Sequence, residues 1–212
     1  MVLQINNLHQ RYGSREILSI PSFGIGHGIY WIQGENGAGK STLFRTLAGM
    51  LPYEGEVKLS DKYDLKKDPV EYRLRLNLGE AEPLYPSFLT PADLIAFVAE
   101  AQRAPREQAD MLTEAFGINY LDNPFGSCSS GMVKKVSLLL AFLGDPSVII
   151  LDEPLITIDW EAREVLFGLI NTYFDRGVTF LLSSHQLFEQ EGMHVSASFR
   201  IQDKTLVRMP QL

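Results

Sequence analysis

A glycine-rich segment near the start of the chain has the residue types and spacing of a phosphate-binding loop. Residues 34–42 fit the pattern G-x-x-x-x-G-K-[ST]. The glycines let successive backbone N–H groups point into one concavity, where they can bind an anion. Lys40 can bring a full positive charge to the β- and γ-phosphates, and the Ser41 hydroxyl can ligate Mg²⁺. The residues expected to bind nucleotide here are Asn36, Gly37, Ala38, Gly39, Lys40, Ser41 and Thr42.

A second candidate group is a pair of carboxylates, Asp152 and Glu153, directly after the apolar run 148–151. Asp152 can hold Mg²⁺, directly or through water. Glu153 points elsewhere and can orient or deprotonate an attacking water. Many strands end in an acidic residue at a solvent edge, so this pair is informative only together with the phosphate loop. The two features together predict a nucleoside triphosphatase.

The predicted secondary structure explains how these groups could meet. A strand precedes the phosphate loop and a helix follows it, a context that disfavours a chance glycine-rich turn. The acidic pair ends another buried strand, at the edge where open α/β sheets bind ligands. Predicted strands cover residues 2–5, 17–20, 29–32, 55–59, 74–78, 148–151, 179–183, 197–201 and 205–208. Predicted helices cover residues 40–50, 91–102, 106–116, 129–144 and 161–176, with a short helix near 186–190.

The order of these elements predicts one α/β domain over residues 1–212. Strands and helices alternate at both ends of the chain, which favours a mainly parallel sheet covered by helices. The middle contains helices without a convincing strand, so residues 83–144 are expected to form an inserted helical subdomain.

Composition indicates which partners and which cellular compartment are expected for this domain. The net charge of −7 disfavours nonspecific binding to nucleic acid. Cys128 is the single cysteine, so no disulfide can form within the chain and a reducing cytoplasm is expected. No stretch approaches the roughly 20 apolar residues of a membrane-spanning helix, and the N-terminus does not resemble a signal peptide. Any role at a membrane is therefore expected to depend on a partner.

Four further segments occur in a characteristic order. They are Tyr12 in Gln10-Arg11-Tyr12-Gly13, the segment Cys128-Ser129-Ser130-Gly131-Met132, Asp159, and His185 in Leu182-Ser183-Ser184-His185. Alone, each has an ordinary explanation, such as a core tyrosine, a serine-rich helix cap or a surface histidine. With the phosphate loop and the acidic pair, they resemble the motifs of the ABC ATPase family over nearly the whole chain.

This resemblance implies a role for each segment. Tyr12 would stack on adenine, and His185 would sense the γ-phosphate. Ser129, Ser130 and Gly131 would face the γ-phosphate held by an opposite subunit, since the start of a helix binds anions. Asp159 would lie in the loop that meets the partner subunit. The expected catalytic residues are Lys40, Glu153 and His185.

The sequence also departs from the family pattern. Ser130 replaces a glycine of the signature motif, whose consensus is LSGGQ, and Cys128 replaces its leucine. Leu155 and Ile156 are unusually apolar for the segment of the family pattern that lies between Glu153 and Asp159. The family glutamine that links the Mg²⁺ site to the membrane partner aligns best with Glu80, with Glu82 as the alternative. A carboxylate can bind metal but cannot donate hydrogen bonds as an amide does.

The resemblance implies that two copies enclose two MgATP molecules head to tail and power a separately encoded integral membrane permease. The chain is similar to single-cassette bacterial exporter subunits, which implies a location in the cytoplasm on the inner face of the cell membrane. The second cassette could be identical or different, and no nucleic-acid partner is expected. The alternatives are a soluble ABC ATPase acting on nucleic acid or ribosomes, and an ATP-gated scaffold with weak turnover.

Overall fold

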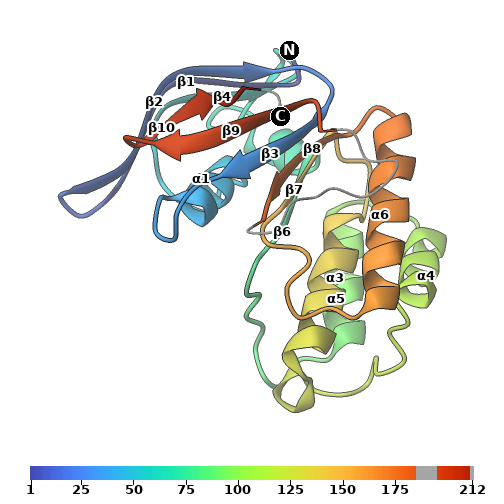
Figure 1. Cartoon of the computed structure of the whole chain (residues 1–212). Helices are drawn as coiled ribbons and strands as arrows, with labels where there is room; N and C mark the ends of the chain where they lie inside the picture. The colour runs from blue at the N-terminus through green and yellow to red at the C-terminus, as the bar shows by residue number, and fades with distance from the viewer. Residues whose placement is uncertain (185–194, 211–212) are drawn as a thin grey trace.

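The computed structural model describes residues 1–184 and 195–210, which form two β-sheets and a group of helices (Figure 1). The first sheet is antiparallel, in the order β2-β1-β4-β5. Its strands are β1 (Leu3–Tyr12), β2 (Arg15–Ile25), β4 (Glu54–Leu59) and β5 (Tyr63–Asp64).

The second sheet has the order β10-β9-β3-β8-β7-β6. Its strands are β3 (Ile29–Gln33), β6 (Leu76–Gly79), β7 (Val148–Leu151), β8 (Thr179–Ser183), β9 (Ala197–Gln202) and β10 (Thr205–Arg208). Neighbouring strands are parallel except for β10, which pairs antiparallel to β9. The predicted fold class, a mainly parallel sheet with an antiparallel edge, is confirmed.

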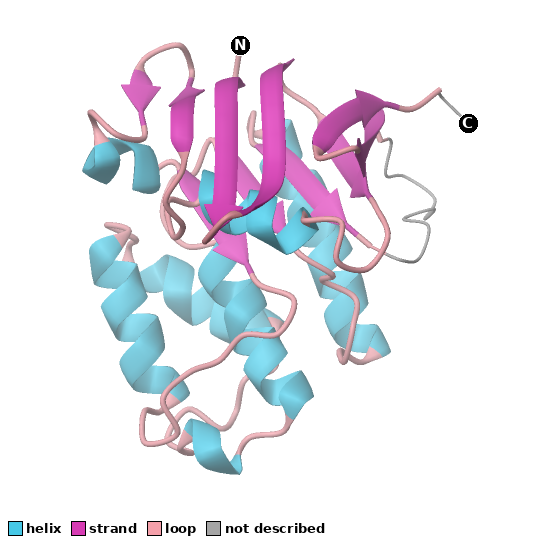
Figure 2. Cartoon of the chain, turned by 90° about the vertical axis from the view of Figure 1, so that its left-hand side faces the viewer, coloured by secondary structure: helices cyan, strands magenta, loops and turns pink. Residues whose placement is uncertain are grey.

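The helices fall into two groups. Helices α1 (Lys40–Leu47) and α2 (Pro69–Arg73) lie near the strands, and the longer helices lie in the opposite part of the molecule (Figure 2). This second group contains α3 (Pro91–Ala101), α4 (Arg106–Ala115), α5 (Ser130–Ala141) and α6 (Trp160–Asp175), with a short 3₁₀ turn, η1 (Phe125–Ser127). No described helix has both the length and the apolar composition needed to cross a membrane. The boundaries 83–144 of a helical subdomain stay a prediction.

The core has two parts because the central strands are apolar on both faces. Ile149 and Leu182 pack on one face among residues of α5 and α6. Ile150 and Leu181 pack on the other face, with residues of α1 and of the antiparallel sheet, including Phe44. The helix that follows the phosphate loop is therefore enclosed between the two sheets, and this packing fixes its position.

The observed elements differ from the predicted ones mainly where apolar residues are sparse. β1 and β2 are longer than the predicted strands, and β2 contains Pro21, which an edge strand tolerates. α1 ends at Leu47 rather than at residue 50, because Gly49 adopts a left-handed φ of +72° that ends the helix. Neither α2 nor β5 was predicted. The short helix predicted near 186–190 lies outside the described residues.

Candidate functional site

The parallel strands bring most of the predicted site residues to one edge of the second sheet. β3, β8, β7 and β6 are neighbours and run in the same direction, so the segments after them emerge side by side. These segments are the phosphate loop after β3, Ser184 after β8, Asp152 and Glu153 after β7, and Glu80 after β6. His185, the predicted γ-phosphate sensor, lies outside the described residues.

The phosphate loop has a backbone shaped for anion binding. Gly37 and Gly39 have φ values of +79° and +108°, which residues with side chains rarely adopt. Gly39 is the N-cap of α1 and has no side chain to accept hydrogen bonds from the first turn. The N–H groups of that turn therefore face the loop, where they can bind an anion. Lys40 is 8% exposed, and its ammonium donates to the carbonyl oxygens of Gly34 at 2.8 Å and Glu35 at 3.3 Å. The cationic group therefore lies over the loop, where a phosphate would bind.

The acidic pair is buried and held by a serine from the next strand. Asp152 and Glu153 are 3% and 7% exposed. The Ser183 hydroxyl donates to Asp152 Oδ1 at 2.5 Å and accepts from the Glu153 backbone N–H at 3.0 Å. Glu153 has a φ of +44°, an uncommon conformation for a residue other than glycine. Ser183 thus fixes both acidic residues, a role that the sequence prediction missed.

Glu80 is held by two basic residues from different helices. Its carboxylate accepts a hydrogen bond from Arg45 Nε of α1 at 2.7 Å, and its backbone oxygen accepts from Lys134 Nζ of α5 at 2.6 Å. Burial lowers the pKa of Lys134 to about 8, although the carboxylates of Asp152 and Glu153 act in the opposite direction. Glu82, the alternative to Glu80, is exposed. The sequence prediction missed Arg45 and Lys134.

The signature-like segment forms the start of α5. Ser129 is the N-cap, and its hydroxyl accepts from the Met132 backbone N–H at 3.2 Å. Ser130 is exposed at the first position of the helix. A Cβ added at Gly131 would come within 2.6 Å of the Thr157 carbonyl oxygen. Glycine is therefore required at 131 by the close approach of the loop before α6.

Asp159 joins this loop to α5. It is the N-cap of α6, accepting from the Ala162 backbone N–H at 2.8 Å, and it forms an ion pair with Lys135 at 2.5 Å. The hydrogen bond from Lys135, and secondarily that from Ala162, lowers the pKa of Asp159. Leu155 belongs to the buried core, which explains its apolar type, whereas Ile156 is 47% exposed.

Tyr12 lies at the turn between β1 and β2 and is 52% exposed. Two cavities border the phosphate loop. One of about 760 Å³ is lined by Gly34 and Ala38, and one of about 260 Å³ by Gly37 and Ala38. Tyr12 lines neither of them, so its predicted stacking on adenine stays a prediction.

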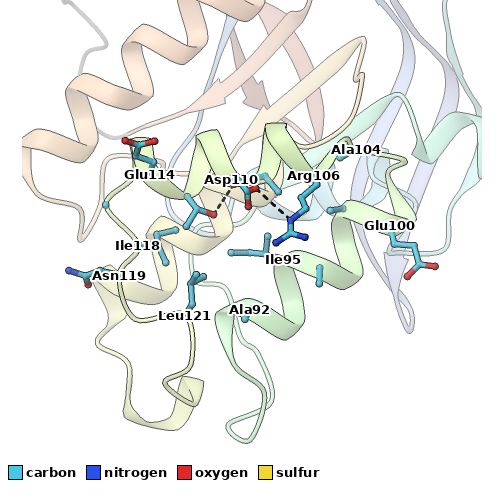
Figure 3. Close-up of a pocket in the computed structure, with 15 residues that line it drawn as sticks. Ala92, Ile95, Glu100, Ala104, Arg106, Asp110, Glu114, Ile118, Asn119 and Leu121 are labelled. Atoms are coloured by element: carbon cyan, nitrogen blue, oxygen red, sulfur yellow. Dashed lines mark hydrogen bonds and ion pairs between the residues drawn. The ribbon is translucent and has the colours of Figure 1, made fainter.

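A larger cavity, of about 850 Å³, lies apart from these residues. It is a mainly apolar groove between α3 and α4, and Arg106 and Asp110 form an ion pair at its rim (Figure 3). None of the predicted site residues lines it.

The described site residues thus form two groups in one chain. The phosphate loop, the acidic pair and Glu80 share the sheet edge. The N-terminus of α5 and Asp159 belong to the helical part of the molecule, apart from α1 (Figure 1). Among the described residues, no group of three or more His, Cys, Asp or Glu side chains is arranged to hold a metal ion.

Comparison with known proteins places this arrangement in a family. The model of the ABC transporter family matches residues 21–156. A Nod factor export ATP-binding protein I of Burkholderia orbicola is 30% identical over 203 residues, which cover 90% of this chain and 65% of that protein. The chain thus spans less than two thirds of this relative's length.

For two further proteins, the aligned region covers similar shares of this chain and of the other protein. The cytochrome c biogenesis ATP-binding export protein CcmA of Haemophilus influenzae is 30% identical over 189 residues, covering 87% of this chain and 89% of that one. A dimeric ATP-binding cassette in a post-hydrolysis state, bound to ADP and Pi, has a TM-score of 0.80 at 17% identity, and 96% of each chain is covered. The predicted family and P-loop fold are both confirmed. The chain belongs to the ABC transporter family and has the fold of its ATP-binding cassettes.

Proposed function

We propose that this chain binds and hydrolyses MgATP as a head-to-tail dimer and thereby powers a separately encoded membrane permease. The observation that carries the proposal is the convergence of Lys40, Asp152 and Glu153 at one sheet edge, beside a loop shaped for phosphate. Lys40 balances charge on the β- and γ-phosphates, and Glu153 orients or deprotonates the attacking water.

The residues present also fit a magnesium ion. The buried carboxylate of Asp152 and the exposed hydroxyl of Ser41 provide the oxygen ligands that Mg²⁺ prefers. When bound with ATP, Mg²⁺ neutralises charge on the phosphates. Glu80 is a further candidate ligand, and its carboxylate would have to leave Arg45 to reach the ion.

The separation of the two groups of site residues supports the dimer. Within one chain, the phosphate loop lies beside the sheets and the start of α5 lies in the helical part. In a head-to-tail pair, Ser129, Ser130 and Gly131 of one subunit would complete the site around the ATP of the other. A cassette of similar fold is described as a dimer in a post-hydrolysis state with ADP and Pi, which is consistent with a dimer here.

Exposed apolar side chains support a permease partner. Leu84, Phe88 and Phe97 are 91%, 78% and 69% exposed, on the segment after Glu80 and on α3. Exposed large apolar side chains are candidates for contact with another protein. Both relatives are named as export ATP-binding proteins, in line with the resemblance to exporter subunits. The chain would then lie in the cytoplasm, against the inner face of the membrane.

The test is phosphate release by the purified chain with ATP and Mg²⁺, compared with Lys40→Ala. The variant loses the only positively charged side chain of residues 34–42, so tight nucleotide binding and turnover should both disappear. Turnover equal to that of the parent would show that the loop assignment is wrong. A parent that binds ATP without releasing phosphate would indicate a scaffold. Recovery of the chain with ribosomes or nucleic acid, rather than with membranes, would indicate a soluble machine.

A further inference from the structure

Lys134 is a fully buried lysine that no motif assigned above requires. It lies one turn into α5 and is 1% exposed. Its ammonium donates to three backbone carbonyl oxygens: those of Glu80 at 2.6 Å, Ala81 at 3.1 Å and Asp152 at 3.1 Å. An ammonium has three N–H donors, so each donor has an acceptor. A buried charge costs several kcal/mol unless it is satisfied in this way.

The three acceptors belong to two segments that carry site residues. Glu80 and Ala81 follow β6, and Asp152 follows β7, whereas Lys134 is on the helix that begins with the signature-like segment. One side chain therefore ties this helix to both acidic segments. Arg45 holds the carboxylate of Glu80 from α1, so Glu80 is attached to both helices.

Backbone anchoring at these points controls where the side chains can reach. The Asp152 carboxylate is oriented by Ser183, and the Asp152 carbonyl is oriented by Lys134. Loss of the second contact would free the Asp152 carbonyl, while the Asp152 backbone N–H keeps its bond to the Gly79 carbonyl at 2.8 Å. The backbone of Glu80 and Ala81 would lose its bonds to α5 altogether.

We propose that Lys134 is a positioning residue, which holds the Asp152 backbone so that its carboxylate can reach the metal ion of the nucleotide, and which fixes the segment of Glu80 beside it. The proposal rests on the function proposed above and adds a residue to it. Lys134 touches neither nucleotide nor metal in this scheme. It acts through the two acidic segments and links their positions to that of α5.

The test uses Lys134→Met, which keeps the length of the side chain and removes the ammonium. Binding of a fluorescent ATP analogue is measured with excess EDTA and with rising Mg²⁺, and phosphate release is measured at saturating ATP. Binding without metal depends on the phosphate loop and should stay within about twofold of the parent. Because hydrogen bonds from a charged donor are worth more than about tenfold in an equilibrium, the Mg²⁺ needed for half-maximal effect should rise at least about fivefold.

Controls separate positioning from general stability. Lys62→Met removes a lysine from the turn between β4 and β5, where no predicted site residue lies, and should leave both titrations unchanged. Far-ultraviolet circular dichroism checks that each variant is folded at the assay temperature. If Lys134→Met does not fold, Lys134→Gln, which keeps two N–H donors, is measured in the same way.

The outcomes are distinct. A raised Mg²⁺ requirement with normal binding in EDTA supports the proposal. An unchanged Mg²⁺ response in a folded variant overturns it, and so does an equal loss of binding with and without Mg²⁺, since that marks a merely structural role. A parent that binds nucleotide with Mg²⁺ but releases no phosphate contradicts the hydrolytic function alone, because the binding titrations still test Lys134.

Discussion

At the scale of single residues, Ser183 holds the two acidic residues at the sheet edge. Its hydroxyl is both donor and acceptor, so it connects the Asp152 carboxylate with the Glu153 backbone. Ser183 is itself completely buried. Water therefore cannot readily replace the hydroxyl, and its removal would leave buried polar groups without this partner.

Ser183→Ala should lower both stability and turnover. The free energy of unfolding should fall by about 1–3 kcal/mol, the usual cost of removing one partner from a buried hydrogen bond. Phosphate release should fall as well, because Glu153 loses the bond that helps to hold its left-handed backbone. Urea unfolding and a phosphate assay measure the two effects. The control is Ser127→Ala, whose hydroxyl bonds an exposed carbonyl. A loss no larger than that of this control would contradict the role of Ser183.

Site residues that belong to a dense sequence motif could be proposed from the sequence. Residues that act through long-range contacts could not. Lys40 and Asp152 were identifiable because neighbours in the sequence define their roles. Arg45 and Lys134 contact a segment that lies 35 and 54 positions away along the chain. No local pattern encodes such contacts. The one available signal was a lysine within a helix that is otherwise largely apolar.

At the scale of elements, the buried strands were predicted best. β7 and β8 have the predicted bounds, since short apolar runs between turns leave few alternatives. β10, which is not buried, also has the predicted bounds. β1 and β2 extend well beyond their apolar runs, because antiparallel pairing continues through polar residues with one side exposed. Helices α3 and α4 begin at the predicted residues and end within one residue of the predicted ends. A proline is the first residue of α3, and another directly precedes α4, so both starts were marked in the sequence.

The link between α5 and α6 gives a prediction at this scale. Asp159 caps α6 through one oxygen and pairs with Lys135 through the other. Asp159→Ala loses both contacts and should cost about 1 kcal/mol of unfolding free energy, mainly from the cap. Asp159→Asn keeps the cap and loses only the ion pair. Because the Asp159 side chain is 47% exposed, that pair is worth at most about 1 kcal/mol.

The lowered pKa of Asp159 predicts how the stability contributed by its ion pair changes with pH. The folded state lowers the pKa of Asp159, so the ion pair stabilises the fold above the unfolded pKa of about 4 and is lost as pH falls through the lower folded value. The parent should therefore exceed Asp159→Asn in stability at pH 7, and the difference should shrink below about pH 4. Urea unfolding at several pH values measures it. A difference that grows on acidification would show that Lys135 is not the partner that matters.

At the scale of the whole molecule, the fold separates the two groups of candidate site residues. The sheet edge carries the phosphate loop and the acidic pair, and the helical part carries the start of α5. The Gly131–Thr157 approach and the Lys135–Asp159 pair fix that start against the loop before α6. The surface that we propose to meet a second subunit is therefore already formed within one chain.

Glu153→Gln tests this arrangement most directly. The amide is nearly the same shape as the carboxylate, so folding and ATP binding should survive, but it cannot act as a base. It also removes one negative charge near the triphosphate, which favours occupancy by ATP. Bound ATP that is not hydrolysed should then hold two subunits together, since a ligand shared between two surfaces stabilises their complex. The expected result is an ATP-dependent dimer with little turnover, whereas the parent stays mainly monomeric.

Size-exclusion chromatography with and without ATP, together with phosphate release, measures both properties of this variant. Hydrolysis at the parent's rate would remove Glu153 from its catalytic role. A monomer at saturating ATP would instead point to the contact between subunits, where Ser130 stands at the first position of α5 in place of the family glycine. The double variant Glu153→Gln with Ser130→Gly separates the two remaining explanations. Dimers restored by glycine would show that the Ser130 side chain obstructs closure around ATP, and persistent monomers would show that the chain pairs with a different cassette.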